Sequence, residues 1–288
     1  DIAMPVMDGI TALAHIMSEH PTPVVILSGI KDAKIAIKSL EYGAVDFIKK
    51  PSGVISYDIE RIKNEIIYKV KTAAGVDVKK IFIYPSVILP MPLTEKGLKR
   101  DKDIIVIGAS TGGPRALTNI ISCIPRNISS AIIIIQHMSP EFIPSFAERL
   151  QWVSSLDISI AQEDDVISQG RVLIAPGGGH TIITQSQTSK RIHLESGESE
   201  HGVSPSVDFA MESAAELYRE KTLGVLLTGM GHDGVKGMKA IKEAGGSTIA
   251  EDESTCVVFG MPKAAIDAGV VDEVVPLPKI AETIMRRI

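Results

Sequence analysis

One segment constrains the fold more than any other, because an apolar run leads through a glycine-flanked serine into the start of a helix. It extends from Asp103 to Arg115 and reads D-I-I-V-I-G-A-S-T-G-G-P-R. A buried strand, a tight turn and a helix in this order are typical of a parallel α/β sheet. The turn follows the pattern G-x-S-x-G, which places the Ser110 hydroxyl beside the free N–H groups of the helix start. The segment therefore predicts a nucleophile and part of an oxyanion hole in one turn.

The same turn has other interpretations, since glycine-rich βα turns also bind phosphate or simply reverse the chain. A P-loop requires a lysine after its second glycine, but here Gly113 is followed by Pro114 and Arg115. The dinucleotide fingerprint G-x-G-x-x-G also fails, because Ser110 occupies the position of its second glycine. On this motif alone, a catalytic serine and a structural turn remain equal alternatives.

The charge balance and the apolar runs exclude several classes of protein. The chain of 288 residues has 35 acidic and 30 basic side chains, a net charge of -5, which argues against a nucleic-acid partner. Its longest apolar run, residues 131–135, is too short for membrane insertion, and we expect a cytoplasmic protein. Cys123 and Cys256 have no C-x-x-C spacing, so we expect buried free thiols.

The first part of the chain alternates helical and strand patterns in βαβα order, which predicts an α/β unit over residues 1–77. Helical patterns cover residues 8–19, 34–42 and 59–70, and strand patterns cover residues 24–27 and 45–48. The periodicity then lapses, and prolines with scattered basic residues predict an extended interdomain linker over residues 78–100.

The remaining residues, 101–288, predict a second and larger α/β domain. Strand-like runs recur at residues 104–107, 131–135, 172–175, 223–227, 247–250 and 270–275. Helical stretches lie between most of them, which favours a doubly wound, mostly parallel, Rossmann-like sheet. Residues 182–194 instead alternate apolar and polar side chains, and we expect a hairpin there.

Two further residues complete a candidate catalytic triad with Ser110. His137 directly follows the strand that ends in Gln136, and Asp233 follows a third strand in the segment L-T-G-M-G-H-D-G. Because the carboxyl ends of parallel strands meet at one edge of a sheet, we expect nucleophile, base and orienting carboxylate to lie together there. Their order along the chain differs from that of the α/β-hydrolases, in which the acid precedes the histidine.

Each of these assignments has a competing interpretation. A histidine after a strand is often only a hydrogen-bonded structural residue, and Asp233 could cap the helix that follows it. His180 and His232 are rival bases, and His180, His232 and Asp233 together could be proposed as metal ligands. No H-x-x-x-H or H-x-E spacing supports that metal site, so we expect no metal in the site around Ser110.

The motifs of the second domain closely resemble the catalytic domain of the chemotaxis protein-glutamate methylesterases, the response-regulator enzymes usually called CheB. The matching segments are G-A-S-T-G-G-P-R-A-L, Q-H-M, L-T-G-M-G-H-D-G and V-V-F-G-M-P-K-A-A. The resemblance implies Ser110 as nucleophile, His137 as base and Asp233 as orienting carboxylate. It also implies that Thr111 and Met230 line the site, with the Met230 N–H at the oxyanion.

The same resemblance implies a substrate and partners. The substrate would be a glutamate γ-methyl ester on the cytoplasmic domain of a chemoreceptor, hydrolysed with release of methanol and without a cofactor. Deamidation of receptor glutamines would be a second activity. Two rivals remain: a non-catalytic receptor-binding module of a response regulator, and an oxidoreductase, against which the failed glycine fingerprint argues.

The first domain resembles the second half of a flavodoxin-like response-regulator receiver. The resemblance implies Asp1 as the phosphorylated aspartate, Ser28 as the switch hydroxyl and Lys50 as the lysine characteristic of the receiver site. A chemotaxis histidine kinase would be the phosphodonor, with Mg²⁺ required, and phosphorylation would expose the esterase site. The acidic pair that helps to hold Mg²⁺ in receivers precedes Asp1, so we expect Mg²⁺ binding to depend on residues outside this sequence.

Overall fold

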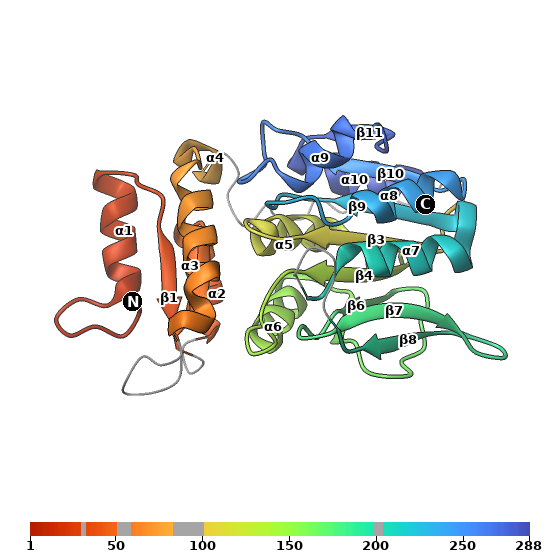
Figure 1. The fold of residues 1–288 in the computed structure, drawn as a ribbon, viewed down its shortest axis with the longest axis horizontal. Helices are drawn as coiled ribbons and strands as arrows, with labels where there is room; N and C mark the ends of the chain where they lie inside the picture. Colours follow the sequence, from red (N-terminus) through yellow and green to blue (C-terminus); the bar gives the residue numbers. More distant parts are fainter. Residues whose placement is uncertain (30–32, 51–58, 83–100, 198–203) are drawn as a thin grey trace. The chain divides into compact units, whose positions relative to one another are not determined.

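The computed structural model describes residues 1–29, 33–50, 59–82, 101–197 and 204–288 of the chain. The chain divides into two compact units, Asp1–Ser86 and Val87–Ile288, and Figure 1 shows the elements of each. The two expected α/β regions therefore correspond to two separate bodies of structure.

The first unit is built on a two-stranded parallel sheet, β1 (Val25–Ser28) and β2 (Asp46–Lys49). Its helices are α1 (Gly9–Glu19), α2 (Ala33–Ser39), the 3-10 turn η2 (Leu40–Tyr42) and α3 (Ile59–Ala74). Helix α1 begins at Gly9 because the Asp8 carboxylate accepts the N–H of Thr11 at 2.8 Å. The predicted helices and strands of this unit are thus confirmed within a few residues.

The start of the predicted linker is not extended. Residues Val78–Phe82 form a short helix, α4, in which Val78 and Ile81 are buried. These two side chains lie three positions apart and so share one helix face, which packs inward. Five residues are too few for a helical period to be recognised in the sequence, which explains the error. Residues 83–100 of the predicted linker lie outside the described residues.

The second unit contains a seven-stranded sheet in which every neighbouring pair of strands is parallel. The order across the sheet is β11-β10-β9-β3-β4-β6-β5. The strands are β3 (Ile104–Ala109), β4 (Ala131–Gln136), β5 (Asp157–Ile160), β6 (Arg171–Ile174), β9 (Thr222–Leu226), β10 (Ser247–Glu251) and β11 (Glu273–Val275). The prediction of a parallel α/β sheet is confirmed, although β5 was not predicted and β11 is shorter than expected.

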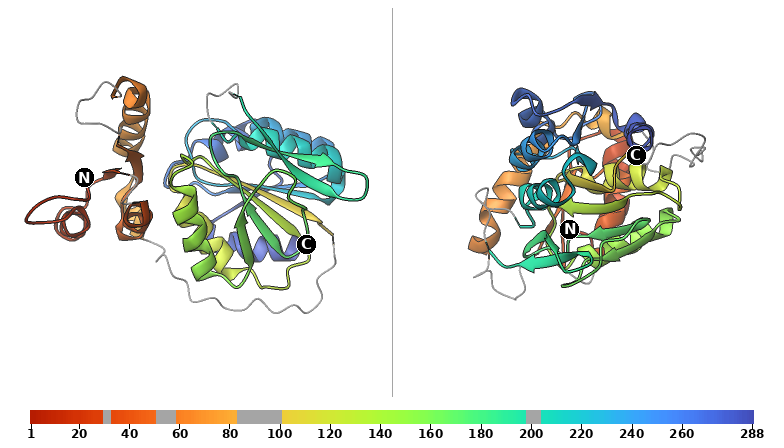
Figure 2. Two further views of the ribbon diagram at one scale, coloured as in Figure 1. Left: turned by 90° about the horizontal axis from the view of Figure 1, so that it is seen from below. Right: turned by 90° about the vertical axis from the view of Figure 1, so that its right-hand side faces the viewer.

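Helices cover both faces of this sheet, as Figures 1 and 2 show. One layer contains α5 (Gly113–Cys123), α6 (Ile143–Val153) and α10 (Leu277–Arg287), and the other contains α7 (Val207–Tyr218), α8 (Val235–Glu243) and α9 (Met261–Asp267). A short 3-10 turn, η3 (Arg219–Lys221), leads from α7 to β9. The central strands β3 and β4 are buried along their whole length, which explains their continuous apolar sequences.

The predicted hairpin is present as a separate two-stranded antiparallel sheet. It consists of β7 (His180–Gln185) and β8 (Lys190–Glu195) and packs against α7. A hydrogen bond from the Ile183 N–H to the Ser213 hydroxyl, at 3.0 Å, joins the hairpin to that helix.

The strand order creates a switch point at β3. From β3 the chain continues to β4 on one side, and it later returns to β9 on the other side. Helices that leave β3 and β9 consequently pass to opposite faces of the sheet at the carboxyl ends of these strands. The segments that follow β3, β4 and β9 meet at this edge.

Candidate active site

Ser110 lies in the turn between β3 and α5 and is 8% exposed. Its N–H donates a hydrogen bond to the Thr228 carbonyl at 3.0 Å, so the turn is fixed to the end of β9. Gly112 has a φ of 80° and lies where a Cβ atom would come within 2.7 Å of the Val257 side chain. Both the left-handed backbone and the close approach require glycine here.

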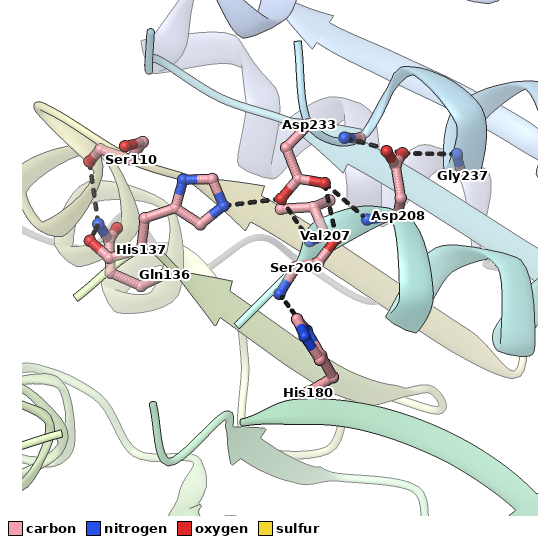
Figure 3. A network of polar contacts seen from close by, with 10 residues as sticks. Ser110, Gln136, His137, His180, Ser206, Val207, Asp208, Asp233 and Gly237 are labelled. Carbon is pink, nitrogen blue, oxygen red and sulfur yellow. Dashed lines mark hydrogen bonds and ion pairs between the residues drawn. The ribbon is translucent and has the colours of Figure 1, made fainter. Parts of the chain in front are cut away.

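His137 follows β4, the strand beside β3. Gln136 is the register partner of Ala109, and the His137 N–H donates to the Ala109 carbonyl at 2.9 Å. The Gln136 side chain joins the two turns, because its amide nitrogen donates to the carbonyls of Ser110 at 2.9 Å and His137 at 3.1 Å (Figure 3). Nucleophile and candidate base are therefore held by one amide group.

Asp233, which precedes α8, accepts a hydrogen bond from His137. The distance from His137 Nε2 to Asp233 Oδ2 is 2.8 Å, and Figure 3 shows the imidazole ring between Ser110 and Asp233. An ionised carboxylate can only accept, so the neutral ring carries its proton on Nε2 and keeps a free lone pair on Nδ1. Ser110 and His137 both lie in the described part of the chain, and there no hydrogen bond joins the Ser110 hydroxyl to this ring. Such bonds often tighten only when substrate binds.

The Asp233 carboxylate has three further donors at the start of α7. They are the Ser206 hydroxyl at 2.8 Å, the Val207 N–H at 2.7 Å and the Asp208 N–H at 3.1 Å. Burial alone would raise the pKa of Asp233, but the hydrogen bonds from His137, Val207 and Ser206 outweigh it and hold the pKa well below its usual range. Asp233 is therefore ionised at neutral pH and orients the His137 ring.

Asp233 does not cap α8, the structural role that the sequence left open for it. That role belongs to Asp208, whose Oδ1 accepts the N–H groups of Gly234 at 2.9 Å and Gly237 at 2.8 Å. Ser206 and Asp208 were not predicted to contribute to the site. Their only sequence signal is a serine followed by an acidic residue at a helix start, which is common in helices without catalytic function.

Thr111, one of the two predicted lining residues, lies within the Ser110 turn, and Met230, the other, follows Gly229 in the segment after β9. Thr111 is buried, and its carbonyl accepts a hydrogen bond from the Thr228 hydroxyl at 2.9 Å. The segment before Met230 touches the nucleophile turn, since a Cβ atom added to Gly229 would lie 2.7 Å from Ser110 Cβ. The Met230 side chain is 37% exposed. The carboxyl end of β9 therefore contacts Ser110 directly.

Two known families match this chain, one in each of its two units. The sequence model of the CheB methylesterase family matches residues 105–284, more than half of the chain. The chain belongs to the CheB methylesterase family. The model of the response regulator receiver domain matches residues 1–57, so the first unit carries receiver sequence.

Relatives of this CheB chain are similar over nearly its whole length. Proteins named protein-glutamate methylesterase/protein-glutamine glutaminase are 43% identical in Pyrococcus abyssi and 40% in Symbiobacterium thermophilum. Both alignments cover 100% of this chain, and they cover 79% and 83% of the two relatives. The crystal structure of the Thermotoga maritima CheB methylesterase catalytic domain matches with a TM-score of 0.64 and 43% identity, over 65% of this chain and 99% of that one.

The rival histidines of this CheB domain have other partners or positions. His180 is buried, where its Nδ1 accepts the Ser206 N–H at 3.2 Å and its Nε2 donates to the Gly197 carbonyl at 3.0 Å. His232 is exposed. It is His137 that pairs with Asp233. In the described part of the chain, no group of three or more His, Cys, Asp or Glu side chains could hold a metal ion.

The three receiver residues of this CheB chain lie close together in the first unit. The Lys50 ammonium forms an ion pair with the Asp1 carboxylate at 2.5 Å, and the Lys50 N–H donates to the Ser28 carbonyl at 2.7 Å. Asp1 would supply one oxygen ligand to Mg²⁺, which prefers octahedral oxygen coordination, but the residues described around it do not complete such a site.

Across the described ranges, no helix is long and apolar enough to cross a membrane.

Proposed function

We propose that this chain hydrolyses glutamate γ-methyl esters on chemoreceptors with a Ser110-His137-Asp233 triad and releases methanol. The observation that carries the proposal is the 2.8 Å hydrogen bond between His137 and Asp233 at the strand edge that also presents Ser110. A buried carboxylate, an oriented imidazole and a serine on a strand-to-helix turn form the arrangement used for acyl transfer. Membership of the CheB methylesterase family and the names of the relatives support the substrate class.

Each residue of the proposed triad has a distinct step. His137 Nδ1 removes the Ser110 hydroxyl proton while the oxygen attacks the ester carbonyl, and Asp233 stabilises the imidazolium that forms. The imidazolium then protonates the departing methoxide, which leaves as methanol. Water repeats the attack on the glutamyl-serine ester with His137 again as base, and the products are free glutamate and Ser110.

The oxyanion of each tetrahedral intermediate needs donors opposite the nucleophile. We assign the N–H groups of Thr111, at the start of α5, and Met230, beyond β9, to this role. Backbone donors of this kind stabilise the transition state by about 3 kcal/mol each in comparable hydrolases. The contact of Gly229 with Ser110 and the bond from Thr228 to Thr111 support the placement of both segments at the nucleophile.

Deamidation of receptor glutamines fits the same residues. Ser110 would attack the amide carbonyl, and the His137 imidazolium would protonate the nitrogen so that ammonia leaves. The names of the relatives include the glutaminase activity, which supports this second reaction.

We assign residues 1–77, together with the helix α4 that follows them, to a receiver region, residues 83–100 to the connection and residues 101–288 to the catalytic domain. In a receiver that includes the acidic pair preceding Asp1, phosphorylation of Asp1 by a chemotaxis histidine kinase, with Mg²⁺, would shift the population toward an exposed esterase site. The proximity of Asp1, Ser28 and Lys50 supports the receiver assignment. The cytoplasmic domain of the receptor is the substrate, so we place the protein in the cytoplasm.

The direct test compares this chain with its Ser110→Ala variant on receptor that carries radiolabelled methyl esters. We expect methanol release by the unaltered chain and almost none by Ser110→Ala. Ser122→Ala is the control and should release methanol normally, because among the described residues the Ser122 hydroxyl bonds the Asn119 carbonyl and the Cys123 thiol within α5. If the folded, unaltered chain released no methanol and Ser110 did not react with a fluorophosphonate, the result would instead support the non-catalytic binding module.

A further inference from the structure

Glu251 is a fully buried carboxyl group that the proposed mechanism does not use. It ends β10, two strands away from β3, and has no exposed surface. Its Oε2 accepts the N–H of Thr228 at 2.9 Å, and its Oε1 accepts the hydroxyl of Thr255 at 3.0 Å. A buried acid is costly unless it is hydrogen-bonded, and here both oxygens have donors.

Thr228 connects this carboxyl group to the nucleophile turn. The carbonyl of Thr228 accepts the Ser110 N–H at 3.0 Å, and its hydroxyl donates to the Thr111 carbonyl at 2.9 Å. Thr228 thus fixes both residues of the turn, and Glu251 fixes Thr228. One residue lies between the buried carboxyl and Ser110.

A second set of bonds starts from Thr255, the other partner of Glu251, and involves the loop after β10 and the segment before Met230. Thr255 accepts the Leu277 N–H at 3.0 Å, which holds the loop after β10 against the start of α10. The same loop returns to β9, because the Val258 N–H donates to the Thr228 hydroxyl at 2.9 Å and the Val258 carbonyl accepts the Gly229 N–H at 3.0 Å. These bonds fix the backbone immediately before Met230.

We propose that Glu251 is a positioning residue of the esterase, which holds Thr228 so that Ser110 and the two oxyanion segments keep their alignment. The inference rests on the proposed function, since it concerns the same site. Glu251 lies behind the turn and does not touch the substrate. Displacements of about 1 Å can lower rates about a hundredfold, so loss of a buried anchor affects chemistry more than substrate binding.

The role depends on hydrogen bonds that both protonation states can make. Burial, with a smaller contribution from the charge of nearby Asp252, raises the pKa of Glu251 to about 7 against the opposing hydrogen bonds from Thr228, Thr255 and Cys256. The carboxylate accepts from Thr255, whereas the protonated acid donates to Thr255, whose own proton can turn to the Asp252 carbonyl at 3.2 Å. In both states Oε2 accepts the Thr228 N–H. A glutamine reproduces the protonated arrangement.

The test compares Glu251→Ala and Glu251→Gln with a matched control, Thr248→Val. Thr248 is equally buried on β10, but in the described part of the chain its hydroxyl bonds residues 270 and 272, before β11. We expect Glu251→Ala to lower kcat for methanol release at least about tenfold with KM changed less than about threefold. Glu251→Gln and Thr248→Val should stay within about threefold of the unaltered chain, and rates of fluorophosphonate labelling of Ser110 should follow the same order.

Equal kcat for Glu251→Ala and the unaltered chain, or an equal loss in Glu251→Gln and Glu251→Ala, would overturn the inference while the proposed function stands. An unaltered chain that neither reacts with fluorophosphonate nor releases methanol would overturn both. If circular dichroism shows that Glu251→Ala does not fold, Thr255→Val and Thr255→Ser test the same carboxyl group, because the Thr255 hydroxyl donates to Glu251 Oε1. The valine variant should lose kcat and the serine variant should keep it, and equal rates would contradict the role.

Discussion

Asp208 and Asp233 cap each other's helices. Asp233, which precedes α8, accepts the N–H groups of Val207 and Asp208 at the start of α7, while Asp208 accepts those of Gly234 and Gly237 at the start of α8. Each carboxylate lies at the positive end of the other's helix dipole, where negative charge is stabilised. The carboxylate that orients His137 is therefore fixed by the packing of two helices.

Replacement of Asp208 by alanine tests this reciprocal arrangement. The variant leaves two buried N–H groups of α8 without their acceptor, so we expect the free energy of unfolding to fall by about 1–2 kcal/mol. Because Asp233 moves with α8, kcat should also fall. Urea unfolding and methanol release measure the two effects. Asp208→Asn retains an acceptor oxygen and should lie between alanine and the unaltered chain, and an unchanged kcat in the alanine variant would contradict the coupling.

Replacement of Asp233 by asparagine tests the tautomer of His137. An asparagine nitrogen in the place of Oδ2 would donate to Nε2 and move the ring proton to Nδ1, on the side of Ser110, while the Val207 N–H would lose its acceptor. We expect kcat to fall by about 10⁴-fold while the fold is retained, as for the equivalent change in serine proteases. Methanol release and circular dichroism provide the two measurements. A loss below about tenfold would show that Asp233 does not set the tautomer.

Replacement of Gln136 by glutamate tests the amide that joins the two catalytic turns. The variant places carboxylate oxygens against the carbonyls of Ser110 and His137, which repel them, and we expect kcat to fall at least about tenfold. Gln151→Glu is the matched control, since Gln151 also bonds backbone groups, but near β5. Both variants should lose stability in urea, and only the Gln136 variant should lose fluorophosphonate labelling of Ser110.

Glu251 predicts a pH dependence of stability. Its pKa is raised from 4.5 to about 7 in the folded chain, so the folded state holds this proton more tightly than the unfolded state. The resulting stabilisation is complete below pH 4.5 and is lost as the pH rises through 7. The Glu251→Gln variant has no such titrating group. Between pH 4.5 and 7, its free energy of unfolding should therefore rise relative to that of the unaltered chain, by up to about 3 kcal/mol. Urea unfolding at several pH values measures the difference, and parallel curves would contradict the assignment.

The sequence predicted that Ser110, His137 and Asp233 lie together because each of them follows a recognisable strand. Ser110 and His137 come after continuous apolar runs, and parallel strands must end at the same edge, so their proximity follows from topology. By contrast, β5 was missed because its four residues are half-buried or exposed at the sheet edge, without a continuous apolar run.

The residues that support the triad could not be predicted in this way. Ser206, Asp208 and Glu251 act through bonds that span 23 to 29 residues of sequence, and their partners are mostly backbone groups. A backbone donor has no sequence signature, and its position is known only when helices and sheet have packed. The sequence therefore indicates which side chains meet at the strand edge, whereas the structure shows which groups hold them there.

The orientation of the His137 ring has a consequence for chemical probes of this protein. Because Nε2 is bonded to Asp233, the nitrogen that faces the nucleophile is Nδ1, the one nearer the main chain. In the serine proteases these two roles are exchanged between the nitrogens. An electrophile carried by a Ser110-directed inhibitor should therefore alkylate Nδ1, and warheads whose length was chosen to reach Nε2 will be the wrong length for this site.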